Sequence, residues 1–149
     1  MNNKFLVFDM DGTLADFYGV DGWLDDIHAR NVRPYAEARP LVDMEKLNDI
    51  LIQLKEFGWY IVVTSWLAKG STKAYDTAVR KTKKEWLETF DFPYDEIHLV
   101  KYGTTKADCT RKHGGRQVLF DDNAKVREGW HLGEAIDATD MMEYLATLL

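Results

Sequence analysis

Two aspartates stand two residues apart directly after a short apolar run. The run of residues 5–8 leads into Asp9, Met10, Asp11, Gly12 and Thr13. An uninterrupted apolar run is typical of a buried parallel strand, and the carboxyl ends of such strands open into a ligand-binding crevice. Two acids there repel each other unless a cation or a proton transfer makes use of them. The spacing therefore predicts metal-assisted attack by a carboxylate, although the same string alone also fits a polar turn after a strand.

Three further segments place polar groups at an expected strand end or helix start. The apolar residues 59–63 lead to the hydroxyls of Thr64 and Ser65. Residues 103–105, Gly-Thr-Thr, place Lys106 near the start of a short helix, and the apolar residues 118–120 end in Asp121 and Asp122. Together with the first pair of acids, these groups comprise a nucleophile, an acid/base, hydroxyl donors, a cation and metal ligands.

In this order the groups resemble the signature of the haloacid dehalogenase (HAD) superfamily of phosphohydrolases: Asp-x-Asp, then Thr/Ser, then Lys, then an acidic pair. The resemblance spans residues 5 to about 123. It implies that Asp9 is the nucleophile and forms an aspartyl-phosphate. It implies that Asp11 protonates the leaving oxygen and later activates water. The superfamily's dehalogenases lack an acid at the Asp11 position, so the resemblance favours phosphoryl transfer over carbon–halogen cleavage.

The resemblance also implies a Mg²⁺ site, since hard oxygen ligands favour Mg²⁺ over zinc. The metal would be held by the Asp9 carboxylate, the Asp11 backbone carbonyl and Asp121. Asp122 would bind it directly or through water.

A phosphate-binding set follows from the same resemblance. Thr64 would hydrogen-bond a phosphoryl oxygen with help from Ser65, although a threonine can equally satisfy its own turn. Lys106 would neutralise the charge of the phosphate and the nucleophile. Lys101 and Lys112 are alternatives; Lys112 would fall inside the short helix, whereas Lys106 lies near its positive N-terminal end, which favours Lys106.

The opening residues 9–17 are similar to the 5′(3′)-deoxyribonucleotidase branch, in which an aromatic residue at the Phe17 position stacks on the nucleobase. Tyr18, Trp23 and Trp66 also fall in or beside the loops expected at the mouth of the site, although most aromatic residues are core residues. The resemblance predicts that Phe17 binds the base of a nucleoside monophosphate, and the place of Trp66 beside the loop that presents Thr64 makes it a second residue expected to bind substrate. The alternative substrates are a sugar phosphate and a nucleic-acid end. The alternative to an enzyme is a HAD-fold binding protein without turnover.

A basic cluster follows the Thr64 segment. Such a cluster usually forms a solvated helix face, and only its first two lysines lie close enough to the predicted site to be candidates for substrate binding. Its members are Lys69, Lys73, Arg80, Lys81, Lys83 and Lys84.

The elements that position these groups alternate between apolar strands and amphipathic helices. This order predicts an α/β fold with about five parallel strands between helices, joined by right-handed crossovers. The strands are expected at residues 5–8, 59–63, 97–100, 117–120 and 134–138, and the helices at 20–31, 43–57, 72–90, 105–113 and 140–149. Residues 14–39 are the only room for a small flap or cap, where Arg33-Pro34 and Arg39-Pro40 are expected to interrupt any helix.

Length and composition predict one compact domain over residues 1–149. The net charge of -6 argues against an extended nucleic-acid surface but is compatible with a small phosphorylated substrate. The lone cysteine, Cys109, excludes an internal disulfide and fits a reducing compartment. Neither a signal peptide nor a run of membrane-spanning length is visible, so we expect a cytoplasmic protein without a membrane partner.

Overall fold

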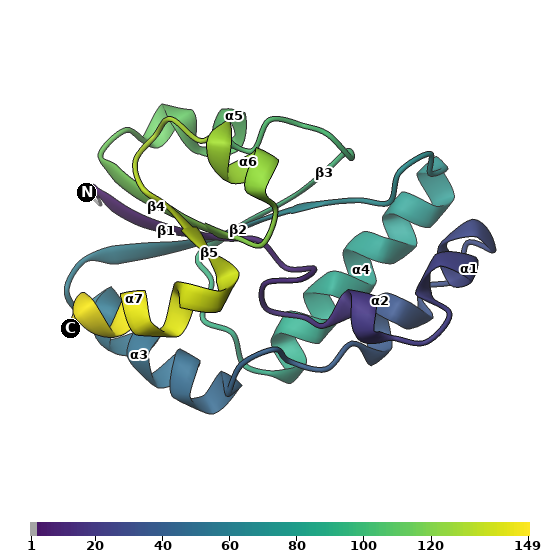
Figure 1. Ribbon diagram of the computed structural model, residues 1–149, viewed down its shortest axis with the longest axis horizontal. Coiled ribbons are helices and arrows are strands. Elements are labelled where there is room, and N and C mark those ends of the chain that lie inside the picture. Colours follow the sequence, from purple (N-terminus) through teal and green to yellow (C-terminus); the bar gives the residue numbers. More distant parts are fainter. Residues whose placement is uncertain (1–2) are drawn as a thin grey trace.

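The computed structural model describes residues 3–149 and contains a five-stranded sheet in which every strand is parallel to its neighbours (Figure 1). The order across the sheet is β3-β2-β1-β4-β5. The strands are β1 (Lys4–Phe8), β2 (Trp59–Trp66), β3 (Glu96–Val100), β4 (Arg116–Asp121) and β5 (Ala135–Asp137). The α/β, Rossmann-like fold expected from the sequence is confirmed. Because β1 lies between β2 and β4, the ends of these three strands meet at one edge.

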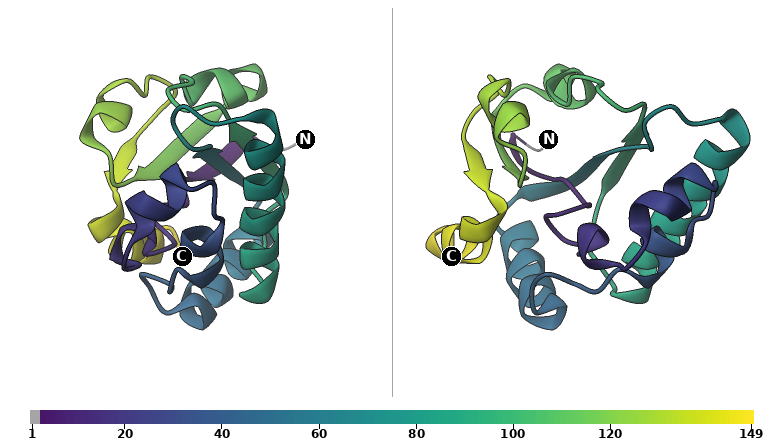
Figure 2. Two further views of the ribbon diagram at one scale, coloured as in Figure 1. Left: turned by 90° about the vertical axis from the view of Figure 1, so that its right-hand side faces the viewer. Right: turned by 45° about the vertical axis from the view of Figure 1, so that its right-hand side comes forward.

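Helices cover both faces of the sheet (Figures 1 and 2). The helices α3 (Met44–Glu56), α4 (Lys73–Thr89) and α7 (Met141–Thr147) pack with one large apolar cluster, which includes Leu6 and Phe8 of β1. The short helices α5 (Ala107–Thr110) and α6 (Ala124–Glu128) lie on the opposite face, where Phe5 and Val7 pack. Successive side chains of β1 therefore pack alternately on the two faces of the sheet, as expected of a strand buried on both sides.

The small insertion of residues 14–39 lies along α4 (Figures 1 and 2). It contains the 3-10 turn η1 (Phe17–Gly19) and the helices α1 (Trp23–His28) and α2 (Arg33–Glu37). Two hydrogen bonds fasten it to α4, from the Tyr75 hydroxyl to the Asn31 carbonyl (2.7 Å) and from Trp86 Nε1 to the Ala38 carbonyl (2.8 Å). The insertion is thus anchored beside the sheet edge where the acids gather.

One expectation for the insertion was wrong. Arg33-Pro34 does not interrupt a helix but begins α2. Proline is compatible with the first turn of a helix, because backbone N–H groups there have no partner within the helix.

Side-chain caps begin two of the helices. The Asp43 side chain accepts a hydrogen bond from the Lys46 amide (3.1 Å) and begins α3. Thr72 accepts one from the Tyr75 amide (3.2 Å) and begins α4. Each bond satisfies a backbone donor that the first helical turn leaves without a partner.

Other boundaries differ by a few residues. Strand β2 continues three residues beyond the expected end, to Trp66, because residues 64–66 pair with residues 98–100 of β3. The helix expected at 105–113 is α5 followed by the 3-10 turn η2 (Arg111–His113), and another 3-10 turn, η3 (Ala138–Asp140), precedes α7. None of the helices within residues 3–149 combines the length and apolar character that crossing a membrane requires.

Candidate active site

The register of three adjacent strands brings Asp9, Thr64 and Asp121 to one level of the sheet. Phe8 of β1 pairs with Val63 of β2 and with Phe120 of β4. The Asp9 amide donates to the Phe120 carbonyl (3.0 Å), which continues the pairing by one residue. Alternation along each strand directs the next side chains toward the face that α5 and α6 cover. Groups separated by more than a hundred residues therefore share one small region.

Lys106 lies directly before α5 and joins two of these acids. Its ammonium group donates to Asp9 Oδ1 (2.8 Å) and to Asp121 Oδ2 (2.7 Å), and all three side chains are buried. Burial by itself lowers the pKa of Lys106, but the charges of the two carboxylates outweigh burial and hold the pKa above its ordinary value. The alternatives Lys101 and Lys112 are both exposed.

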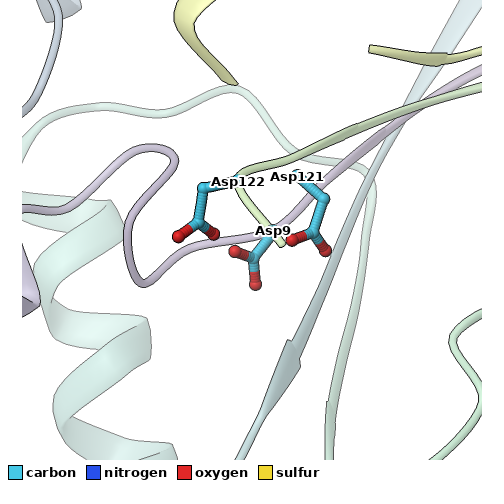
Figure 3. Close-up of side chains that lie close together, drawn as sticks. All are labelled: Asp9, Asp121 and Asp122. Atoms are coloured by element: carbon cyan, nitrogen blue, oxygen red, sulfur yellow. The ribbon is translucent and has the colours of Figure 1, made fainter. Parts of the chain in front are cut away.

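Asp9, Asp121 and Asp122 form a cluster of carboxyl groups, shown side by side in Figure 3. Each offers an oxygen, and these oxygens lie within 4.8 Å of one another. The Thr13 hydroxyl links two of them, donating to Asp9 Oδ2 (3.1 Å) and accepting from the Asp122 amide (3.2 Å). An all-oxygen set of this size and charge fits a hard divalent cation such as Mg²⁺ better than a soft metal.

The carboxyl groups of the second acidic pair have perturbed proton affinities. Burial, then the negative charge of Asp9, raises the pKa of Asp121, while Lys106 opposes the shift. Asp122 is exposed as a residue, but its carboxyl group lies beside Asp9 in the cavity; loss of hydration and the charge of Asp9 raise its pKa to about 7. Concentrated negative charge of this kind is a feature of sites that bind a cation or transfer a proton.

Gly12 makes the turn after Asp11 possible. Its φ of +84° is in the left-handed region that favours glycine. A Cβ atom at this position would also collide with the carboxyl group of Asp122. A side chain at residue 12 would therefore disturb both the turn and the cluster of carboxyl groups.

Asp11 points to a different partner from that of Asp9. Its Oδ2 accepts a hydrogen bond from the Lys83 ammonium group (3.0 Å), and the residue lines the cavity. Burial, followed by the charge of Asp9, raises the pKa of Asp11 although Lys83 acts in the opposite direction. Asp11 therefore lies close to the cluster of Asp9, Asp121 and Asp122 without its own carboxylate being part of that cluster.

The assignment of Lys83 to a solvated helix face was wrong. Its side chain is 1% exposed and donates to Asp11, to Ser65 Oγ (2.7 Å) and to the Trp66 carbonyl (2.8 Å). One signal in the sequence could have identified it. Tyr75, Val79 and Lys83 recur every four residues along α4, so Lys83 lies in the apolar stripe of the helix.

The two hydroxyls of β2 have different surroundings. Ser65 is buried, lines the cavity and accepts the hydrogen bond from Lys83. Thr64 is fully buried, and its Oγ1 has no hydrogen-bond partner among residues 3–149. Thr64 is at the level of Asp9 but is not part of the wall of the cavity that Ser65 lines, and its buried hydroxyl keeps an unused donor.

A cavity of about 400 Å³ lies above the acids. On one side it is bounded by aromatic residues of the insertion, and on the other by residues that follow β2 and β3. The aromatic lining residues are Phe17, Tyr18, Trp23, Tyr35, Trp66 and Tyr102. The site thus combines a charged floor with walls that can contact a planar group.

The two aromatic residues predicted to bind substrate both line this cavity. Phe17 is only 4% exposed, because its ring packs against Tyr35 (centroids 4.7 Å apart), whereas Tyr18 is 54% exposed. Trp66 is half-buried, donates from Nε1 to the Thr104 carbonyl (2.8 Å) and lies 5.3 Å from the Lys106 ammonium. Tyr18 therefore presents more free ring surface than Phe17.

The two lysines considered for substrate binding, Lys69 and Lys73, differ in their distance from the cavity. Lys69 lines the cavity and its ammonium lies 5.8 Å from the Tyr102 ring, so it stays a candidate for substrate contact. Lys73, the other candidate, is exposed on α4 and is not part of the cavity wall.

Comparison with known proteins leaves the family open. No protein-family model matches the chain, and no curated protein does. Among solved structures, a crystal structure of a protein from Vibrio cholerae is similar at 24% sequence identity over 64% of this chain and 68% of that chain, with a TM-score of 0.39. A likeness at this level bears on neither family nor activity.

Proposed function

We propose that this protein is a Mg²⁺-dependent phosphomonoesterase of the HAD type. The observation that carries the proposal is the grouping of Asp9, Asp121 and Asp122 within 4.8 Å, with Lys106 bonded to the first two. Asp11 lies beside this group at the same cavity. A nucleophile, a fixed cation, oxygen ligands for a metal and a second carboxyl group are the parts that phosphoryl transfer through a covalent intermediate requires.

In the first step an oxygen of Asp9 attacks phosphorus, and the bond between phosphorus and the leaving oxygen breaks. Thr13 and Lys106 hold the Asp9 carboxylate by hydrogen bonds to its two oxygens. The Asp11 carboxyl donates its proton to the leaving oxygen. Lys106 and the Thr64 hydroxyl offset the charge that develops on the phosphoryl oxygens.

In the second step the ionised Asp11 takes a proton from water, which attacks the phosphorus of the aspartyl-phosphate. The bond between phosphorus and the Asp9 oxygen breaks, inorganic phosphate leaves, and Asp11 regains its proton. The raised pKa of Asp11, due first to burial, supports such an exchange of roles.

Asp9, Asp121 and Asp122 would hold the Mg²⁺ ion, together with the Asp11 backbone carbonyl. When bound, the ion neutralises charge on the phosphoryl group and orients it toward the nucleophile. The carboxyl oxygens present fit this ion in number, type and spacing.

We further propose a nucleoside monophosphate as the substrate. Aromatic residues on both walls of the cavity support a planar leaving group, and the volume of about 400 Å³ suits a small ligand. Sugar phosphates offer no planar group to these walls.

A phosphatase screen tests this proposal. Purified protein is assayed with an aryl phosphate, nucleoside monophosphates and sugar phosphates, each with Mg²⁺ and with a chelator. We expect hydrolysis that needs Mg²⁺, is lost in Asp9→Asn and is most efficient for a nucleotide. Full activity in Asp9→Asn would refute the mechanism. Equal efficiency for sugar phosphates would leave the phosphatase assignment in place but would exclude a nucleoside monophosphate as the preferred substrate.

A further inference from the structure

Lys83 has no part in the proposed mechanism, yet it is the centre of a buried polar network that includes Asp11. It reaches from the apolar stripe of α4 to the ends of β1 and β2, where it donates to Asp11 Oδ2 (3.0 Å), Ser65 Oγ (2.7 Å) and the Trp66 carbonyl (2.8 Å). Its ammonium also lies 5.2 Å from the centroid of the Tyr35 ring. An ammonium group has three N–H donors, and each of the three has an acceptor here.

Packing alone does not account for a lysine at this position. Removing an ammonium group from water is costly, and a leucine or methionine would fill the stripe beside Val79 and Leu87 without that cost. A buried charge that is held by three acceptors, one of them a carboxylate at the proposed site, therefore has a role at that carboxylate.

The geometry at Asp11 defines the role. Lys83 binds Oδ2, and no residue of the chain from 3 to 149 donates a side-chain hydrogen bond to Oδ1. Because two of the three acceptors belong to β2, the ammonium is fixed against a rigid strand and fixes the carboxyl group in turn. One oxygen is thus immobilised while the other is free for a ligand in the cavity that Asp11 lines.

We propose that Lys83 is a positioning residue that aims the carboxyl group of Asp11 at the leaving oxygen of the substrate. This inference rests on the proposed phosphatase function. It assigns to Lys83 no contact with substrate or metal: the residue acts through the orientation of Asp11, and it couples that orientation to α4 and, through Tyr35, to the insertion.

The dependence on the leaving group separates this role from a merely structural one. An alkyl phosphate needs a proton on its leaving oxygen, whereas the phenolate released from p-nitrophenyl phosphate leaves without one. The ratio kcat/KM reports steps up to release of the first product, so it excludes the later attack by water. In Lys83→Met, kcat/KM for an alkyl phosphate should fall about 10²-fold or more, the usual size of a general-acid contribution. For p-nitrophenyl phosphate it should fall less than about threefold if only proton donation is lost.

Further variants complete the experiment. Lys84→Met changes the adjacent exposed lysine of the same helix and should leave both substrates unaffected. The double variant Asp11→Asn/Lys83→Met should be no slower on the alkyl phosphate than Asp11→Asn alone, because a positioning residue has nothing to act on once the acid is gone. Thermal denaturation checks folding, and Lys83→Gln provides the same comparison if the methionine variant does not fold.

The outcomes are distinguishable. Equal losses on the two phosphates, or losses that add in the double variant, overturn the role of Lys83 while the phosphatase function stands. If the wild-type protein hydrolyses neither phosphate with Mg²⁺, the proposed function fails and the inference fails with it.

Discussion

Replacing Lys106 by methionine removes the cation that the structure places between two buried carboxylates. The Lys106 side chain is 4% exposed and that of Asp121 is 1% exposed, so water cannot replace the lost charge. Breaking a buried ion pair by removing one partner typically costs about 3–5 kcal/mol. We expect Lys106→Met to lose about this much unfolding free energy in the presence of a chelator.

The loss is large against the total stability of a domain, which is commonly about 5–15 kcal/mol. For a chain of this length, about 2–4 °C of Tm accompanies each kcal/mol, so Tm should fall by about 6–20 °C. The pKa of Lys106 is higher in the folded state than in the unfolded chain. Its contribution to stability is therefore fully present below the ordinary pKa of lysine, which includes neutral pH, and is lost as the pH rises through the raised pKa of the folded state.

Magnesium should reverse part of this loss. In the variant, the carboxyl oxygens of Asp9, Asp121 and Asp122 remain within 4.8 Å of one another with no lysine among them, so a divalent cation gains affinity for the site. Thermal denaturation of wild type and Lys106→Met, each with chelator and with millimolar Mg²⁺, measures both effects. The Mg²⁺-induced rise in Tm should be larger in the variant than in the wild type.

The matched control is Lys112→Met, because Lys112 is exposed and belongs to the segment just after α5. An exposed substitution of this kind should change stability by less than about 0.5 kcal/mol. In the activity assay Lys106→Met should cost about 10²–10³-fold in kcat, as loss of a charge-stabilising donor does, and Lys112→Met should cost little. If Lys106→Met has the same Tm as the wild type in chelator, the reasoning is refuted. If Lys112→Met loses more activity than Lys106→Met, the catalytic lysine is Lys112.

Three further substitutions test the acid and the aromatic wall. Asp11→Asn should slow the turnover of an alkyl phosphate about 10²-fold or more when chemistry is limiting; unchanged turnover would remove Asp11 from proton transfer. Tyr18→Ala should lower kcat/KM for a nucleoside monophosphate about tenfold, since one base–aromatic contact is worth about 1–3 kcal/mol, and should spare a phosphate without a base. Phe17→Ala, at a ring that is 4% exposed, should also destabilise the fold by about 3–5 kcal/mol in a denaturation assay. Equal losses on both substrates in Tyr18→Ala would mark that ring as a packing residue.

Much of the architecture follows from local patterns in the sequence. The apolar runs that end in Asp9, Thr64 and Asp121 indicate buried parallel strands, and parallel strands in adjacent positions deliver their next residues to one edge. The caps Asp43 and Thr72 also have a local basis, because a side chain that satisfies the first amides of a helix acts within three residues. The preference for Lys106 over Lys112 also had a local basis, the position just before a helix.

Contacts between distant segments decided what the sequence left open. Five of the six residues in the basic cluster lie on α4, and composition alone does not distinguish among them. Only the packing of α4 against the sheet places Lys83 at Asp11, 72 positions earlier in the chain, while Lys84 faces solvent. Packing within the insertion likewise buries Phe17 against Tyr35 and leaves Tyr18 exposed. The sequence by itself determined the residue types and the strand ends that carry them, because these depend on near neighbours. The partner of each charged group was decided by the tertiary structure, because burial and pairing depend on segments that meet only when the chain is folded.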